Sequence, residues 1–238
     1  MLRLILDRSC ALTSFALAAG DQILCKMQWG GSMRSPGWFA EMAESIQGAG
    51  RSVAEVDEFI CVTGPGSFSG IRSALAALEG MALPGQKPLY GISSAAVLAA
   101  EYFRGDADLV SVIGDARRSR LWCVNFKLDQ SGIKIDAGKD ITNTASDFRL
   151  IKPQELAGEV SAGALVISPD WDRIEDQLTA TFPADRLIKK NVSPGVEIIV
   201  ALLAKFPSVC TLEPLPVYLH PAVAAKKLCS SSVFMERL

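Results

Sequence analysis

The spacing of apolar residues divides the first hundred residues into an ordered series of elements. Three short apolar segments, residues 2–6, 12–17 and 23–27, have the length of strands. The last two are separated by Ala19-Gly20-Asp21, whose composition favours a tight turn. The short links between the segments predict an antiparallel meander of three strands.

A helical period follows this meander. Ser35 is a suitable helix cap, and Pro36 suits the first position of a helix. Phe39, Met42 and Ile46 then recur at spacings of three and four residues, which predicts a helix that ends near residue 48. A capping-box pattern at residues 52–55 predicts one further helical turn.

Strands and helices alternate from residue 59 onward. Apolar strands are predicted at residues 59–62 and 89–92, each followed by a helix, at 71–81 and at about 94–103. A meander extended by parallel strands, each reached through a helical crossover, predicts a ribonuclease-H-like unit. An unspecified α/β sandwich remains as the alternative.

The second half of the chain shows a similar order. Strands are predicted at residues 109–113 and 121–128 around a charged turn, with further short strands near Ile133, Ile135 and Ile141 and within 160–168. A helix is predicted to start at Ser193-Pro194 and to run to about residue 206. We therefore expect an N-terminal lobe of residues 1–104 and a smaller C-terminal α/β lobe of residues 105–238 that includes a C-terminal tail.

Composition excludes several classes of protein. Hydrophobic residues make up 49% of the 238 residues and the mean hydropathy is +0.25, which fits a chain with a sizeable core. The net charge of −2 gives no overall attraction to nucleic acid, so any RNA contact requires a local patch or a partner. Six cysteines without a CxxC pair indicate reduced thiols, and no apolar run approaches the ~20 residues of a membrane span. These features predict a cytoplasmic protein with no membrane contact.

The stretch VTGPGSFSGIR at residues 62–72 is the most distinctive segment. A Walker A loop requires a glycine followed by lysine, but Ile71 follows Gly70, and the dinucleotide pattern GxGxxG is missed by one residue. The loop still leads into a helix N-terminus, which can favour an anion. The alternative is a tight glycine turn in which Ser67 or Ser69 caps the helix and Phe68 packs against the core or a partner. The candidate binding residues are Asp7, Gly64, Gly66, Ser67, Gly70 and Arg72.

Other candidates for catalysis are few. His220 is the single histidine, so a metal site with two histidines is excluded, and a serine or cysteine nucleophile would depend on this one base. Asp7, Asp115 and Asp170 each follow a predicted strand, where actin-like ATPases keep their magnesium and phosphate ligands. Arg8, however, offers Asp7 a salt-bridge partner. No catalytic residue and no metal site is assigned.

The glycine stretch carries a resemblance to a known family. The sequence GPGSFSGIR at residues 64–72 resembles the GPGSFTGxR signature of the bacterial TsaB (YeaZ) family, also described as M22 glycoprotease-like. Further pieces that match are the strand ending in Asp7, Asp115-Ala116-Arg117, Glu213-Pro214 and the sequence PVYL at residues 216–219. A departure is Asp7-Arg8-Ser9, where the family usually has an Asp-Thr-Ser-like turn.

This resemblance implies a fold and a role. The fold is that of the actin-like ATPases (ASKHA), with two ribonuclease-H-like lobes, each a mixed sheet flanked by helices. The role is in forming threonylcarbamoyladenosine (t6A) at adenosine 37 of tRNA, as a non-catalytic scaffold of the metal-binding paralogue TsaD. The ATPase TsaE joins that assembly, and tRNA is reached through the complex. ATP or ADP at the partner interface and a homodimer are left open.

The resemblance also implies an interface on the first helix. Trp38, Phe39, Met42 and Ile46 lie on one side of that helix, and such a seam suits packing against a partner helix. The alternative is that the seam faces the protein's own sheet. Two other functions remain as alternatives, an actin-like ATPase or kinase and an M22-like peptidase that depends on His220.

Overall fold

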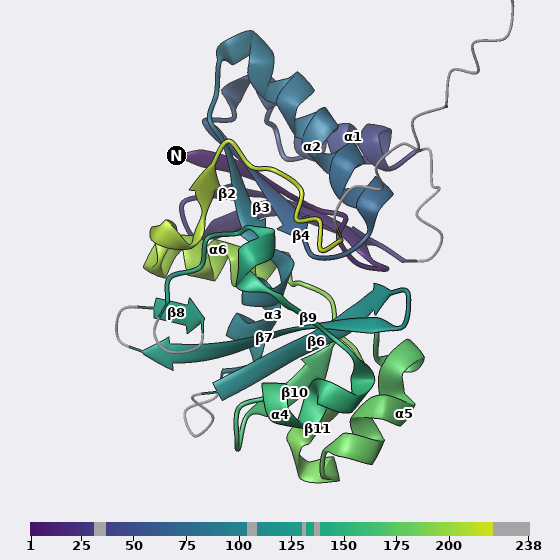
Figure 1. Cartoon of the computed structure of the whole chain (residues 1–238). Helices are drawn as coiled ribbons and strands as arrows, with labels where there is room; N and C mark the ends of the chain where they lie inside the picture. Colours follow the sequence, from purple (N-terminus) through teal and green to yellow (C-terminus); the bar gives the residue numbers. More distant parts are fainter. Residues whose placement is uncertain (31–36, 104–108, 130–131, 136–138, 221–238) are drawn as a thin grey trace, which may run out of the picture.

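The protein contains two six-stranded sheets with a helical layer between them (Figure 1). The structure is a computed structural model that describes residues 1–30, 37–103, 109–129, 132–135 and 139–220. Among these residues, no helix is long and apolar enough to cross a membrane.

The first sheet has the spatial order β12-β5-β4-β1-β2-β3. The first three strands form an antiparallel meander, β4 and β5 extend it in parallel, and β12 pairs antiparallel with β5 at the edge. The strands are β1 (Leu2–Asp7), β2 (Thr13–Ala19), β3 (Gln22–Trp29), β4 (Glu58–Gly64), β5 (Leu89–Ser93) and β12 (Thr211–Leu212).

Alternation along the strands gives the first sheet two apolar faces. Leu4 and Leu6 on β1 face a cluster formed with α1 (Trp38–Gly48) and α2 (Phe68–Ala82), whereas Ile5 belongs to the cluster on the opposite face. Because successive side chains of a strand point to opposite faces, one short apolar strand supports both layers.

The second sheet repeats this arrangement, with the order β11-β10-β6-β7-β8 and β9 paired to β7. Here too a meander is extended by parallel strands, and α4 and α5 cover the outer face. The elements are β6 (Leu109–Arg117), β7 (Arg120–Asp129), β8 (Gly132–Ile135), β9 (Arg149–Ile151), α4 (Leu156–Glu159), β10 (Leu165–Ser168), α5 (Trp171–Thr181) and β11 (Leu187–Asn191).

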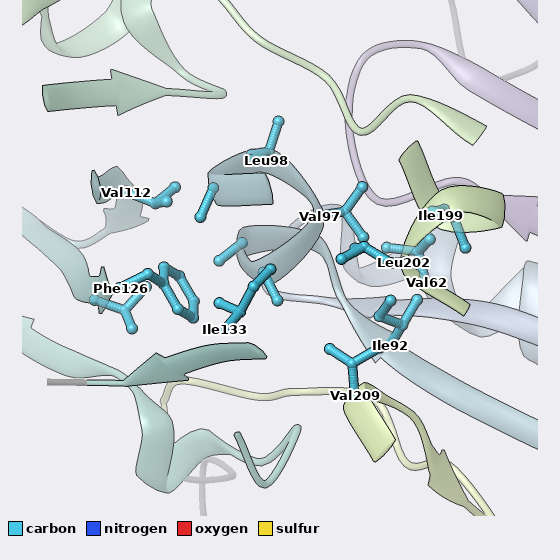
Figure 2. Close-up of a cluster of buried hydrophobic side chains, with 14 of the residues drawn as sticks. Val62, Ile92, Val97, Leu98, Val112, Phe126, Ile133, Ile199, Leu202 and Val209 are labelled. Carbon is cyan, nitrogen blue, oxygen red and sulfur yellow. The ribbon is translucent and has the colours of Figure 1, made fainter. Parts of the chain in front are cut away.

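The two sheets share a core through α3 (Ser94–Tyr102) and α6 (Val196–Lys205). Figure 2 shows Val97 and Leu98 of α3 between Val62 of the first sheet and Val112 of the second, with Ile199 and Leu202 of α6 beside them. Residues 95–99 of α3 are all completely buried, which explains why this helix is apolar on every side. One continuous core therefore joins the two lobes.

Short 3₁₀ turns connect several of these elements. The first, Val53–Glu55, has the predicted capping box, because Glu55 accepts a hydrogen bond from the amide of Ser52 at 2.7 Å. The other turns are Leu83–Gly85, Ala145–Asp147, Pro153–Glu155, Ala184–Arg186 and Pro207–Val209.

The predicted fold class is confirmed, with two lobes that each consist of a meander, parallel strands and flanking helices. The predicted boundary at residues 104 and 105 falls outside the described residues and stays a prediction. The chain returns to the first lobe after β11, however, because α6 packs on β1 and β2 and β12 joins the first sheet. This whole segment was predicted to belong to the C-terminal lobe.

Other differences are local. The helix predicted from Ser193 begins at Val196, with Gly195 as its cap, and α5 and β11 were not predicted. The predicted cap at Ser35-Pro36 lies outside the described residues, as does Cys229. The other five cysteines are free, as expected for reduced thiols.

Candidate functional site

The turn after β1 places a buried carboxyl group at the end of the strand. Asp7 is completely buried, and its Oδ1 accepts a hydrogen bond from the amide of Ser9 at 2.7 Å. Its Oδ2 has no hydrogen-bond partner among the described residues. Burial raises the pKa of Asp7 to about 6, against the lowering effect of the hydrogen bonds from Ser9. The carboxyl group is therefore easier to protonate than an exposed aspartate.

The Arg8 side chain reaches from the turn after β1 to the outer helices of the first lobe. Its guanidinium donates to the Ser73 hydroxyl on α2 at 2.7 Å and lies 4.5 Å from the centre of the Trp38 ring on α1. Burial lowers the pKa of Arg8. This side chain ties the turn after β1 to both outer helices of the first lobe.

The glycine loop between β4 and α2 is packed against this same turn. A Cβ atom at Gly66 would lie 2.1 Å from the carbonyl oxygen of Ser9, so only glycine fits. The amide of Ser67 donates to that oxygen at 2.7 Å, and the Ser94 hydroxyl on α3 donates to the carbonyl of Pro65 at 2.8 Å. The loop is thus held from both sides by the rest of the chain.

Ser67 caps α2, as one of the two sequence interpretations expected. Its hydroxyl accepts a hydrogen bond from the amide of Gly70 at 3.2 Å, while Gly64 has a φ of +103°. Phe68 is not buried, because 58% of its surface is exposed, and it lies 5.1 Å from the ring of Tyr218. The guanidinium carbon of Arg72 lies 5.1 Å from the centre of the Phe68 ring.

The second lobe brings together the two other predicted carboxylates, Asp115, which lies within β6 rather than after it, and Asp170, which follows β10. The backbone amide of Asp115 donates a hydrogen bond to Oδ2 of Asp170 at 3.0 Å. Arg117 pairs with Asp115 at 3.0 Å, and Arg173 lies 3.9 Å from Asp115 and 3.8 Å from Asp170. Burial raises the pKa of Asp170. Both carboxylates therefore have cationic and amide partners within the lobe.

Cys10 lies in the turn after β1, within reach of the charges of both Asp7 and Asp170. The pKa of the Cys10 thiol is raised by burial and by the nearby charges of Asp7 and Asp170. A thiol in such surroundings is a poor nucleophile, because the thiolate is the reactive form. Within the described part of the chain, no three His, Cys, Asp or Glu side chains gather in a way that could hold a metal ion.

His220 connects the C-terminal segment to the second lobe. Its Nε2 atom lies 2.6 Å from the carbonyl oxygen of Ala116 in β6. Earlier in this segment, the amide of Val217 donates to the carbonyl of Thr63 at 2.9 Å, at the end of β4. The imidazole is thus used in a structural contact between the two lobes.

The structure divides the predicted interface residues of α1 into two groups. Met42 and Ile46 are 0% and 1% exposed and pack in the cluster between α1, α2 and the first sheet, as in the alternative in which the seam faces the protein's own sheet. Phe39 is 45% exposed, and Trp38 packs edge-on against it. A partner role of the exposed edge of α1 stays a prediction.

Asn143 forms contacts that hold the site together and that were not predicted from the sequence. Asn143 accepts a hydrogen bond from the amide of Ser93 at 2.7 Å and donates to the carbonyl of Val209 at 2.9 Å. It has a φ of +55°, which asparagine tolerates better than most residues. Nothing in the neighbouring sequence identifies this role, because both partners are more than 45 residues away along the chain.

A pocket of about 420 Å³ lies elsewhere, between β8 and the segment after α6. It is lined by Gly132, Ile133, Lys134, Asp140, Ile141, Phe206, Ser208 and Val209. None of the candidate residues from the sequence lines it.

Comparison with known proteins gives consistent similarities. Residues 40–183 match the family model of TsaD, tRNA N6-adenosine threonylcarbamoyltransferase. The chain is 23% identical over 187 residues to the tRNA threonylcarbamoyladenosine biosynthesis protein TsaB of Escherichia coli K12, covering 76% of this chain and 78% of that protein.

Two solved structures from Pseudomonas aeruginosa share the fold. YeaZ has a TM-score of 0.71 at 22% identity, and a protein with similarity to peptidase YeaZ has a TM-score of 0.72 at 21% identity. Each match covers 92% of this chain and 99% of the other. Because the family model spans more than half of the sequence, the chain belongs to the TsaD family, and within it to the TsaB (YeaZ) proteins.

Proposed function

We propose that this chain takes part in t6A formation on tRNA as a non-catalytic partner of a TsaD-type paralogue in the cytoplasm. The proposal is supported by the family match and by the role printed in the name of the E. coli relative. A TsaE-type ATPase joins the assembly, and tRNA is engaged by the complex as a whole.

The packing of the glycine loop is the observation that carries this proposal. A phosphate-binding loop offers free backbone amides to the ligand. Here the amides of Ser67 and Gly70 are bonded to Ser9 and to the Ser67 hydroxyl, and Gly66 lies directly against Ser9. A loop with these contacts suits a structural corner better than a phosphate cradle.

The surroundings of the candidate catalytic groups support the same proposal. His220 contacts a backbone carbonyl, and the pKa of the Cys10 thiol is raised, so neither group resembles an activated base or nucleophile. We therefore assign the chemistry of threonylcarbamoyl transfer to the partner.

The proposal is tested by mass spectrometry of tRNA nucleosides after depletion of this protein. We expect t6A to fall and to return when the intact gene is supplied. Co-purification of the tagged chain with a TsaD-type protein tests the partnership separately. Unchanged t6A after depletion would overturn the role in tRNA modification. A fall in t6A as expected, but with no co-purification of a TsaD-type protein, would overturn the partnership alone.

A second candidate, nucleotide binding by this chain, is favoured by one observation. Asp7 lies at the end of β1, where actin-like ATPases keep magnesium and phosphate ligands, and its Oδ2 has no hydrogen-bond partner among the described residues. Calorimetric titration with Mg²⁺ and ATP, for the chain alone and with its partner, tests this candidate. Binding that disappears in Asp7→Ala would favour it, and binding seen only with the partner would place ATP or ADP at the interface.

A further inference from the structure

The hairpin turn between β6 and β7 presents arginine side chains in an unusual backbone conformation. Arg117, Arg118 and Ser119 have φ values of +65°, +53° and +56°, in the left-handed region that glycine and asparagine normally occupy in such turns. Arg118 and Ser119 are exposed, and 63% of the Arg117 side chain is accessible. Three successive residues of this kind project the two arginines from the end of the second sheet.

The neighbouring helix adds another exposed arginine. The Arg173 side chain on α5 is 52% exposed and lies near Asp115 and Asp170, whose side chains are only 18% and 27% exposed. These two carboxylates lie beneath the arginines and orient them. Asp172 is bonded instead to Asn191 on β11. Arg117, Arg118 and Arg173 thus outnumber the exposed carboxylate of Asp172 on this part of the surface.

An exposed aromatic pair lies close to the arginine turn. Phe68 and Tyr218 are 58% and 43% exposed, and Arg72 lies over the Phe68 ring. Tyr218 is only two residues before His220, whose ring contacts Ala116, so the chain between them spans at most about 7 Å. In Figure 1 the free end of the β6–β7 hairpin lies on the same side of the molecule as the first turn of α2.

These side chains have the chemistry of RNA loop recognition. Arginines neutralise phosphates, while exposed aromatic rings and guanidinium planes stack on unpaired bases. The surface consists of Phe68, Arg72, Arg117, Arg118, Arg173 and Tyr218, and we call it the arginine–aromatic surface. A chain with a net charge of −2 would have to contact RNA through such a local patch.

We propose that the arginine–aromatic surface binds single-stranded RNA, with phosphates on the arginines and a base against Phe68 and Tyr218. The inference rests on the proposed function, because that function makes tRNA the substrate of the complex. It adds that this chain contacts the unpaired part of the tRNA directly and does not only support its partner.

The test is binding of a fluorescently labelled, unmodified tRNA transcript to the purified complex of this chain with its TsaD-type partner. Phe68→Ala is expected to weaken binding about tenfold, because it removes one base-stacking contact. Arg118→Glu is expected to weaken binding and to reduce the slope of log Kd against log salt by about one. Binding of the chain alone is measured in parallel, so that the result does not depend on complex formation.

Arg51→Glu provides a matched control. Arg51 is exposed and cationic, but it precedes the turn at residues 53–55 near the start of β1, whereas the arginine–aromatic surface lies beyond the other end of that strand. This control is expected to bind tRNA like the wild type, and all three variants should retain the wild-type melting temperature because the altered side chains are exposed.

Two outcomes would overturn the inference. Wild-type tRNA affinity and salt slope in both Phe68→Ala and Arg118→Glu would show that RNA does not use this surface. Loss of the TsaD-type partner in pull-down, with unchanged tRNA affinity of the chain alone, would identify the surface as a protein interface. In either case, t6A loss on depletion would leave the proposed function intact, and normal t6A would refute that function separately.

Discussion

Gly66 is the residue at which the glycine loop meets the turn after β1. A methyl group there would lie 2.1 Å from the Ser9 oxygen and 2.9 Å from its carbonyl carbon, both of which are backbone atoms that cannot turn aside. We expect Gly66→Ala to destabilise the protein by about 2 kcal/mol or more, measured by urea denaturation.

Gly80 provides the control for this substitution. It lies within α2, and a Cβ atom there would meet nothing within 4 Å. Alanine is the better helix former, so Gly80→Ala is expected to raise the free energy of unfolding by about 0.5–1 kcal/mol. Equal stability of Gly66→Ala and the wild type would mean that the loop does not rest on Ser9.

Asp7 gives a prediction for the pH dependence of stability. Its pKa is about 6 in the folded protein and about 3.9 in an unfolded chain, so the folded state binds more protons between these values. The contribution of Asp7 to the free energy of unfolding therefore falls by about 2–3 kcal/mol as the pH rises from 4 to 6. Asp7→Asn keeps the oxygen that accepts from Ser9 and removes the buried charge.

We expect Asp7→Asn to melt at a higher temperature than the wild type at pH 7.5 and to lose this advantage at pH 4. The quantity to follow is the difference in melting temperature between the variant and the wild type at each pH, because the other carboxylates titrate in both proteins. A variant less stable than the wild type at pH 7.5 would indicate that a partner, such as a bound cation, stabilises the Asp7 carboxylate.

At the scale of elements, α1 has one face in the core and one edge in solvent. Met42→Glu would bury a charge among apolar side chains, and we expect the protein to lose its cooperative thermal unfolding. Phe39→Glu alters a half-exposed ring and should leave the melting temperature nearly unchanged. If the exposed edge of α1 contacts the TsaD-type partner, the Phe39→Glu variant will no longer bring down this partner in a pull-down.

A folded Phe39→Glu variant that retains the partner would assign the interface to another surface. A cooperative melt of Met42→Glu would contradict the position of α1 on the first sheet. The two variants thus distinguish a partner interface from packing on the protein's own sheet. The sequence alone left both open, because both place apolar residues at the same spacing.

The elements of the first lobe could be predicted because their sequence periods are regular. The alternation along β1 and the spacing of Ile71, Leu75 and Leu78 on α2 follow from one face packing on one core. In α5, Trp171, Ile174 and Leu178 also have helical spacing, but charged residues surround them and the helix was missed. Its apolar stripe is narrow because it covers only the outer face of the second sheet.

The site was predicted less completely than the fold. The positions of Asp7 at the end of β1 and of Asp170 just after β10 follow from the strand pattern, and Ser67 was one of two predicted helix caps. Asp115 was predicted to follow a strand but lies within β6, which continues to Arg117. The contacts of Asn143 and the stacking of Phe68 on Tyr218 depend on pairs far apart in the sequence, which no local period encodes.

At the scale of the whole molecule, the last described segment holds the two lobes together. It pairs with β5 through β12, donates from Val217 to the end of β4, and then contacts Ala116 in the second lobe through His220. Together with the shared core of α3 and α6, these contacts join two similar lobes.

His220 distinguishes this structural role from catalysis. His220→Ala removes a single hydrogen bond to Ala116, so we expect a loss of about 1 kcal/mol in the free energy of unfolding. The t6A content of cells that carry only this variant should equal that of the wild type, as measured by nucleoside mass spectrometry. If His220 were the base of a peptidase, the same substitution would abolish peptidase activity. Depleted t6A at a normal level of the variant protein would show that the imidazole does more than join the lobes.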